Sequence, residues 1–173
     1  AVAVGKAFSL KNSWKFWLLG MFCAIAPDFD AIGFKLGVPY ESFWGHRGFT
    51  HSFVFAALLA LIVVMVFYRS LAASQKHFWM LWLYFFICTA THPILDAMTT
   101  GGMGVAFLSP FDNTRYFFPW RPIQVSPIGI AAFFSEKGMR VIKSELVWVF
   151  LPSFVFIGLM YLVKRKRKVS STE

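Results

Sequence analysis

The sequence predicts an all-α fold, a polytopic membrane helical bundle with three full spans, a short N-terminal helical hairpin and long interfacial loops. Of the 173 residues, 58% are hydrophobic and only 14% are charged, and the mean hydropathy is +0.62. Soluble domains usually carry about 25% charged residues. Apolar runs of helical length also alternate with stretches rich in glycine, proline and charge. We therefore expect one integral membrane domain covering residues 1–173.

The N-terminal part predicts helices over residues 1–8 and 14–26. The second run would be roughly 20 Å long at about 1.5 Å per residue, which is shorter than the roughly 30 Å hydrocarbon core of a bilayer. We expect it to lie tilted, or to pack against residues 1–8 as a hairpin. Pro27 should end it, leaving Asp28 and Asp30 in the turn that follows.

Two longer runs, residues 50–68 and 77–96, predict full membrane spans. Thr50 or Ser52 can cap the first of them, since a side-chain oxygen at that position accepts a hydrogen bond from the first helical turn. The second span ends at His92 and Asp96. The glycine-rich and aromatic stretch between Asp30 and the first of these spans predicts a loop.

The C-terminal part predicts a second long loop, an amphipathic helix and a last span. Glycine and proline interrupt residues 99–127, where charged residues lie between aromatic ones, as is typical of a membrane interface. Residues 128–143 are expected to form an interfacial helix with its basic side chains on one face. Residues 145–163 are expected to cross the membrane.

The charge distribution predicts the orientation of the chain. The net charge is +9, and five of the seventeen basic residues form the run 164–168 directly after an apolar segment. Such a run retains a helix end in the cytoplasm, so we expect a cytoplasmic C-terminus and no contact with nucleic acid. Alternating spans then place seven ionisable side chains on the outer face: Asp28, Asp30, His46, His51, His92, Asp96 and Glu145.

These ionisable residues predict a metal site. His92 and Asp96 are four residues apart, so a helix places them on one face, and ionisable groups at that depth usually serve a function. Imidazole nitrogen and carboxylate oxygen bind zinc, manganese and other first-row metals. We expect one or two divalent ions, most favourably zinc, on six residues: Asp28, Asp30, His46, His51, His92 and Asp96.

The two aspartates that follow Pro27 are also the candidate catalytic residues. Asp28 and Asp30 could bridge two ions, or supply one ligand and one general base. Glu145 is a candidate additional ligand. Structural readings stay open for each group: His92 and Asp96 as a hydrogen-bonded pair, Asp28 as a turn residue, and Glu145 as a carboxylate in the first turn of a helix.

Three arginines are candidates for binding a phosphate or carboxylate on a substrate, because the guanidinium fork matches those oxyanions. They are Arg47, Arg115 and Arg121. The alternative is that they anchor lipid headgroups. Cys23 and Cys88 lie inside apolar runs and are interpreted as buried structural residues.

Four motifs also carry a resemblance to a known family. They are Ala26-Pro-Asp-Phe-Asp30, Gly45-His-Arg-Gly-Phe-Thr-His-Ser52, Thr91-His-Pro-Ile-Leu-Asp96 and Phe118-Pro-Trp-Arg-Pro122. Their order resembles that of the YdjM-type membrane-bound, metal-dependent hydrolases, also described as LexA-binding inner-membrane-associated hydrolases. The resemblance implies a multi-pass protein of the bacterial inner membrane with a divalent-metal site on the six residues named above. Family members also carry a Thr-His pair near the start, so the resemblance suggests a trimmed N-terminus here; whether a ligand was removed with it stays open.

The residues and the resemblance together predict a hydrolase at the outer membrane face. A metal-activated water would cleave a phosphoester or ester of a lipid or amphiphile. The alternative is a non-catalytic membrane protein in which a structural metal joins the loops and presents a surface to a protein partner. A metal transporter fits less well, because no polar pair marks the middle of the spans.

Overall fold

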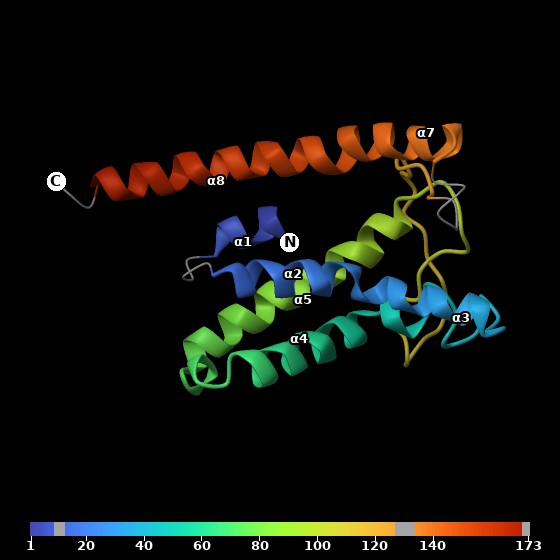
Figure 1. Cartoon of the computed structure of the whole chain (residues 1–173), viewed down its shortest axis with the longest axis horizontal. Coiled ribbons are helices and arrows are strands. Elements are labelled where there is room, and N and C mark those ends of the chain that lie inside the picture. The colour runs from blue at the N-terminus through green and yellow to red at the C-terminus, as the bar shows by residue number, and fades with distance from the viewer. Residues whose placement is uncertain (9–12, 127–133, 171–173) are drawn as a thin grey trace.

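The computed structural model describes residues 1–8, 13–126 and 134–170 (Figure 1). Over these residues the regular structure is helical, with two isolated β-bridges in the loops, so the predicted all-α class is confirmed. Three of the described helices are long and apolar enough to cross a membrane: Trp14–Lys35, Gln75–Ala97 and Glu136–Lys166.

The core is a layer of three helices. The helix α5 (Gln75–Ala97) packs against both α2 (Trp14–Ile25) and α4 (Phe53–Phe67), as Figure 1 shows. Phe16 of α2 stacks on Tyr84 of α5, with ring centroids 4.0 Å apart. Gly20 lets the two helices approach, because a Cβ atom there would overlap the Tyr84 hydroxyl.

Helical backbone continues beyond α2, where the sequence predicted a turn. The 3₁₀ helix η1 (Ala26–Ala31) and the short α3 (Ile32–Lys35) follow directly. Pro27 lies at the start of η1, a position where its missing N–H leaves no hydrogen bond unmade. The expected short helix 14–26 is therefore part of a longer helical segment. The predicted partner helix 1–8 corresponds to α1 (Val2–Ala7), which contacts α2 and the C-terminal helix α8 (Leu151–Ser170).

The helix α4 is shorter than the expected span 50–68. Its cap is Ser52, whose hydroxyl accepts a hydrogen bond from the backbone N–H of Phe55 at 3.0 Å. The three residues before the cap form the 3₁₀ helix η2 (Phe49–His51). At the other end, a tight connection through η3 (Leu71–Ala73) leads into α5.

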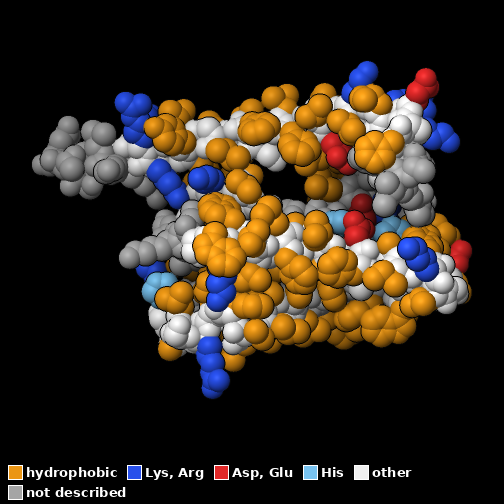
Figure 2. All heavy atoms as spheres, in the orientation of Figure 1, with side chains coloured by type: hydrophobic (Ala, Val, Ile, Leu, Met, Phe, Trp, Pro, Cys, Tyr) orange, Lys and Arg blue, Asp and Glu red, His pale blue; other side chains and the backbone are white. Residues whose placement is uncertain are grey.

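The C-terminal helices form one continuous rod. The helices α7 (Glu136–Glu145), η4 (Leu146–Phe150) and α8 (Leu151–Ser170) follow one another without a break, where the sequence predicted a separate interfacial helix and span. Residues 128–133 of the predicted interfacial helix lie outside the described residues. The segment η4 is a π-helix, a local widening that inserts an extra residue without ending the helix. Figure 2 shows this rod separated from the α2, α4 and α5 layer by a hollow.

Candidate metal centre

The loops and helix ends bring four potential metal ligands together. Asp28 comes from η1, His51 from η2, and His92 and Asp96 from the last turns of α5. One ligand atom from each of these residues lies within 4.8 Å of the other three. We call these residues the four-residue cluster.

His92 is oriented by a backbone contact. Its Nδ1 lies 2.9 Å from the carbonyl oxygen of Ala24, and because a carbonyl can only accept, Nδ1 must carry the proton. In the neutral ring, Nε2 then presents a lone pair to the cluster, 3.2 Å from Asp28 Oδ1 and 3.7 Å from Asp96 Oδ2. This arrangement fixes the tautomer that a metal ligand needs.

His51 is oriented by Asp30 in the same way. The His51 side chain is fully buried, and its Nδ1 lies 3.0 Å from Asp30 Oδ2. Its Nε2 faces Asp96 Oδ2 at 3.2 Å and Asp28 Oδ1 at 3.7 Å. Asp30 therefore acts on the cluster through the imidazole, as carboxylates behind metal-binding histidines commonly do.

Both oxygens of Asp30 are engaged. Oδ1 accepts a hydrogen bond from His46 Nδ1 at 2.6 Å, and Oδ2 accepts from the Thr50 hydroxyl at 2.5 Å and the Arg47 backbone N–H at 3.2 Å. Asp30, His46 and His51 form a second group whose ligand atoms also lie within 4.8 Å of one another. Because those contacts already occupy Asp30, its geometry fits an orienting role better than direct coordination.

Arg47 is buried behind the cluster. Its Nε lies 3.1 Å from Asp96 Oδ2 and its Nη2 3.2 Å from Asp96 Oδ1, while Nη1 donates to Thr99 Oγ1 and the Gly101 carbonyl. The Arg47 backbone has a φ of 62°, which non-glycine residues rarely adopt. Gly102 has φ 88°, and a Cβ there would press on the Arg47 guanidinium. Gly102 thus makes room for this arginine.

A cation fits the four-residue cluster on the chemistry of its donors. His51 Nε2 and His92 Nε2 are buried atoms without a hydrogen-bond partner among the described residues. Burial alone would lower the pKa of His51, but the carboxylates of Asp28, Asp30 and Asp96 outweigh it and raise that pKa to about 10. The same carboxylates would stabilise a divalent ion, and two imidazoles with two carboxylates are a ligand set that zinc accepts.

The cluster opens into a cavity of about 690 Å³. Asp28, His46, His92 and Asp96 line it on one side, and Glu145 lines it from the α7–α8 rod. The Asp28 side chain is 52% exposed, whereas that of His51 is fully buried, so the cluster has one accessible side and one closed side. Figure 2 shows acidic and imidazole side chains along the edge of the hollow beside the rod.

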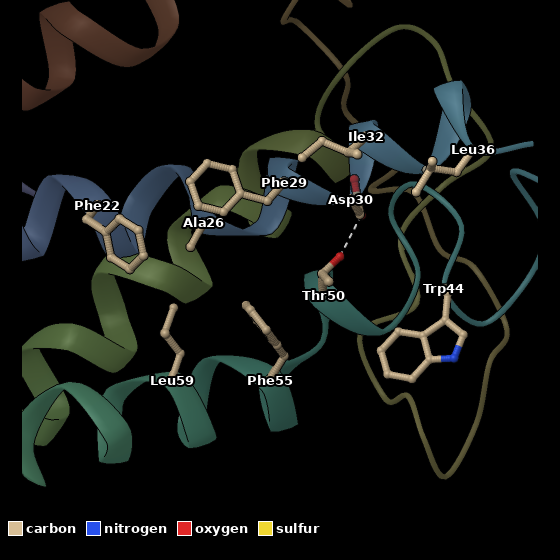
Figure 3. Close-up of a pocket in the computed structure, with 11 residues that line it drawn as sticks. Phe22, Ala26, Phe29, Asp30, Ile32, Leu36, Trp44, Thr50, Phe55 and Leu59 are labelled. Atoms are coloured by element: carbon tan, nitrogen blue, oxygen red, sulfur yellow. Dashed lines mark hydrogen bonds between the residues drawn. The ribbon is translucent and has the colours of Figure 1, made fainter. Parts of the chain in front are cut away.

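A second pocket, of about 510 Å³, lies on the Asp30 side of η1 (Figure 3). Apolar side chains from the α2–α3 segment and α4 surround it, including Phe22, Phe29 and Phe55, and the bonded pair Asp30 and Thr50 also lines it. This pocket therefore flanks the orienting aspartate, not the four-residue cluster.

Three other predicted site residues do not belong to the four-residue cluster: Arg115, Arg121 and Glu145. Arg115 donates hydrogen bonds to the backbone carbonyls of His46 and Tyr40, both at 2.8 Å, and so holds the first loop. The exposed guanidinium of Arg121 stacks over the ring of Phe117 at 4.7 Å. Glu145 reaches the shared cavity but belongs to neither group of potential ligands.

The sequence analysis did not identify several residues that hold the site. Ala24 contributes only a backbone carbonyl, which no sequence pattern marks. Thr50, by contrast, lies inside the Gly-His-Arg-Gly-Phe-Thr-His-Ser motif, so its position beside His51 was a usable signal. Thr99 and Gly102 lie just after the His-Pro-x-x-Asp motif, where they complete the environment of Arg47.

Comparison with known proteins agrees with this architecture. The family model described as YdjM inner membrane protein matches residues 1–168. The chain is also similar to the inner membrane protein YbcI of Escherichia coli strain K12, with 39% identity over 146 residues, covering 84% of this chain and 83% of that protein. No solved structure matches the chain.

The match extends over nearly the whole sequence and includes every residue of the four-residue cluster. Together with the three long apolar helices, it makes this chain a multi-pass inner-membrane protein. The family expected from the motifs is confirmed: the chain belongs to the YdjM inner membrane protein family.

Proposed function

We propose that this protein is a metal-dependent hydrolase that cleaves a phosphoester or ester of a membrane lipid or other amphiphile. The observation that carries the proposal is that the four-residue cluster opens into the 690 Å³ cavity through the half-exposed Asp28. A metal that served only to join loops would need no opening from its ligands into a cavity. One divalent ion, most favourably zinc, would be held by Asp28, His51, His92 and Asp96.

A bound divalent ion would polarise the scissile group and lower the pKa of a water molecule. The protein residues supply the proton transfers around that step. Asp28 is the exposed carboxylate of the cluster and can accept the proton of the attacking water as general base. The water oxygen then bonds to phosphorus or carbon, the bond to the leaving oxygen breaks, and that oxygen needs a proton.

In this proposal, His46 provides that proton. It lines the same cavity, and its Nδ1 donates to Asp30, so the opposite ring nitrogen is the one left to exchange a proton. Asp30 orients both imidazoles, since its carboxylate contacts Nδ1 of His46 and Nδ1 of His51. Asp30 is thus a positioning residue in this proposal, and Asp28 and His46 touch the reacting atoms.

The proposed orientation rests on the basic run at residues 164–168, because such runs favour the cytoplasmic side of a membrane. The C-terminus would then be cytoplasmic and the site would lie at the outer face. A site at a membrane face suits a substrate whose apolar part stays in the bilayer. The apolar wall of the cavity, which includes Ile25, Leu95 and Val149, supports the same substrate class.

Zinc-loaded protein in mixed micelles, screened against a panel of lipid phosphoesters and esters, tests the proposal. We expect turnover that His92→Ala abolishes together with metal binding. His46→Gln should keep the metal and lower kcat by about 10²- to 10⁴-fold, the usual contribution of a general acid. Hydrolysis that persists in His92→Ala, or no hydrolysis of any substrate by metal-loaded protein, would contradict the proposal.

One observation favours a second candidate, a structural metal in a non-catalytic protein. Four protein ligands are the closed set that structural zinc sites use. A metal there would join η1, η2 and the end of α5, with the long loops presenting a surface to a protein partner. This candidate predicts loss of folding on metal removal without any measurable turnover.

A further inference from the structure

The helix α7 and the loop beside it form another pocket, of about 330 Å³. Lys137, Arg140 and Val141 line it from α7, and Gln124 and Val125 line it from the loop. Arg140 and Val141 lie three and four residues after Lys137, so all three belong to one face of α7. Val141 is only 1% exposed and closes the floor, while both basic side chains are exposed at the rim.

The loop wall of this pocket is fixed by hydrogen bonds. The backbone N–H of Gln124 donates to Ser144 Oγ at 3.0 Å, which ties the loop to α7. The backbone N–H of Val125 donates to Thr100 Oγ1 at 3.2 Å, which ties it to the segment after α5. The pocket is therefore bounded by two elements that are joined to each other and to the metal-site region.

The charge of the rim is uncompensated within the described part of the chain. Neither Lys137 nor Arg140 forms an ion pair with a described carboxylate, in contrast to Arg47, which pairs with Asp96. An ammonium and a guanidinium one helical turn apart match the oxygens of a phosphate group. Lys143 is on the same helix but does not line the pocket.

The pocket adjoins the cavity of the metal cluster. Gln124 and Val125 line both, and Glu145 continues the same face of α7 one turn beyond Val141. The cavity in turn borders α2, α5 and the α7–α8 rod, the helices long enough to cross a membrane. A ligand whose phosphate lies between Lys137 and Arg140 would thus be beside both the bilayer and the cluster.

We propose that Lys137 and Arg140 bind the phosphate of an anionic membrane lipid, and that the pocket presents this lipid to the metal cluster. The binding site stands on its own observations, whereas presentation to the cluster rests on the proposed hydrolase function. The substrate would then be an anionic phospholipid and not a neutral amphiphile.

Native mass spectrometry of the full-length protein in neutral detergent tests the binding site, with dioleoyl phosphatidylglycerol and dioleoyl phosphatidylcholine as probes. We expect preferential binding of phosphatidylglycerol, and we expect Lys137→Gln with Arg140→Gln to weaken it by about tenfold or more, because each basic residue contributes to anionic-lipid affinity. Lys143→Gln removes one of the same kind of charge from the same helix outside the pocket, where the double variant removes two, and it should leave affinity within about twofold. Unchanged metal content would show that the double variant is folded.

Equal binding by wild type and the double variant, or equal loss in Lys143→Gln, would overturn the site. Displacement of the lipid by inorganic phosphate at equal concentration would overturn the choice of a lipid as the source of the phosphate. His92→Ala should bind phosphatidylglycerol normally. If the metal-loaded wild type binds phosphatidylglycerol normally but hydrolyses no lipid, the hydrolase function is refuted and the lipid-binding site still stands.

Presentation to the cluster has its own readout in the hydrolysis assay. The double variant should raise KM for anionic phospholipids and leave kcat nearly unchanged, since it removes binding to a part of the substrate that does not react. A fall in kcat with unchanged KM would contradict presentation by this pocket.

Discussion

Asp30 orients two other side chains, those of His46 and His51. Its carboxylate contacts His46 at 2.6 Å and His51 at 3.0 Å without belonging to the four-residue cluster. We expect Asp30→Asn to weaken zinc affinity by about 10- to 100-fold, as loss of an orienting partner typically does, while the stoichiometry of binding stays the same. A chelator competition titration measures this. Glu41→Gln, an exposed carboxylate change in the neighbouring loop, is the control, and an unchanged affinity in Asp30→Asn would refute the orienting role.

Arg47 makes a prediction about stability. Its side chain is 5% exposed and bonds to Asp96 and Thr99, so Arg47→Ala would leave a buried carboxylate without its charge partner. We expect the free energy of unfolding to fall by about 3 kcal/mol or more. Denaturation in mixed micelles provides the measurement, with the exposed Arg121→Ala as the comparison. Similar stability losses in both variants would show that the Arg47 contacts contribute little.

At the residue scale, the sequence predicted which side chains meet but not the role of each. An α-helix places residues i and i+4 on one face, so the sequence predicted that His92 and Asp96 lie together. Asp28 and Asp30 were assigned the same catalytic and metal-binding roles because both follow Pro27. In a 3₁₀ helix of about three residues per turn, positions i and i+2 point in different directions, and this separates Asp28 at the cavity from Asp30 behind the imidazoles. The burial of Arg47 depends on Thr99 and Gly101, about fifty residues later, which no local pattern reports.

At the scale of helices, the close packing of α2 on α5 positions the site. Ala24, one turn after Gly20 on α2, holds the imidazole of His92 on α5. Gly20→Ala should push the helices apart at Tyr84, and we expect lower thermal stability and weaker metal binding together. Gly158→Ala on α8 is the matched control, because a Cβ there meets nothing within 4 Å and alanine favours a helix.

Tyr84→Phe tests the cause of that effect. Removing the hydroxyl that the new methyl group would strike should recover part of the stability lost in Gly20→Ala. No recovery in the double variant, or an equal loss in Gly158→Ala, would show that helix separation at this contact is not the reason.

The sequence predicted which segments are helical, but it did not predict where each helix ends. Hydropathy predicts α4 and α5 because their apolar runs are long. The continuation through Pro27 depends on proline being tolerated in the first turn of η1, and the fusion of α7 with α8 depends on the π-helix η4. Neither leaves a distinctive pattern, because both adjust the backbone and not the polarity of the residues.

At the scale of the whole molecule, the proposed orientation predicts which loops face the outside. Phe111, 87% exposed in the second long loop, should be labelled as Phe111→Cys by a membrane-impermeant maleimide applied to intact spheroplasts. Lys76→Cys, in the connection before α5, should be labelled only after lysis. The native Cys23 and Cys88 are fully buried and should react little. Labelling of Lys76→Cys alone in intact spheroplasts would reverse the orientation.

The central claim is that segments distant in the sequence converge on one metal site. Elemental analysis of protein purified without an affinity-tag metal tests it most directly, with wild type compared with Asp28→Ala, His92→Ala and Glu41→Gln. We expect about one equivalent of zinc or another first-row metal in wild type and Glu41→Gln, and loss of metal from Asp28→Ala and His92→Ala while both remain folded. Folded wild-type protein that binds no metal after incubation with zinc would contradict the account.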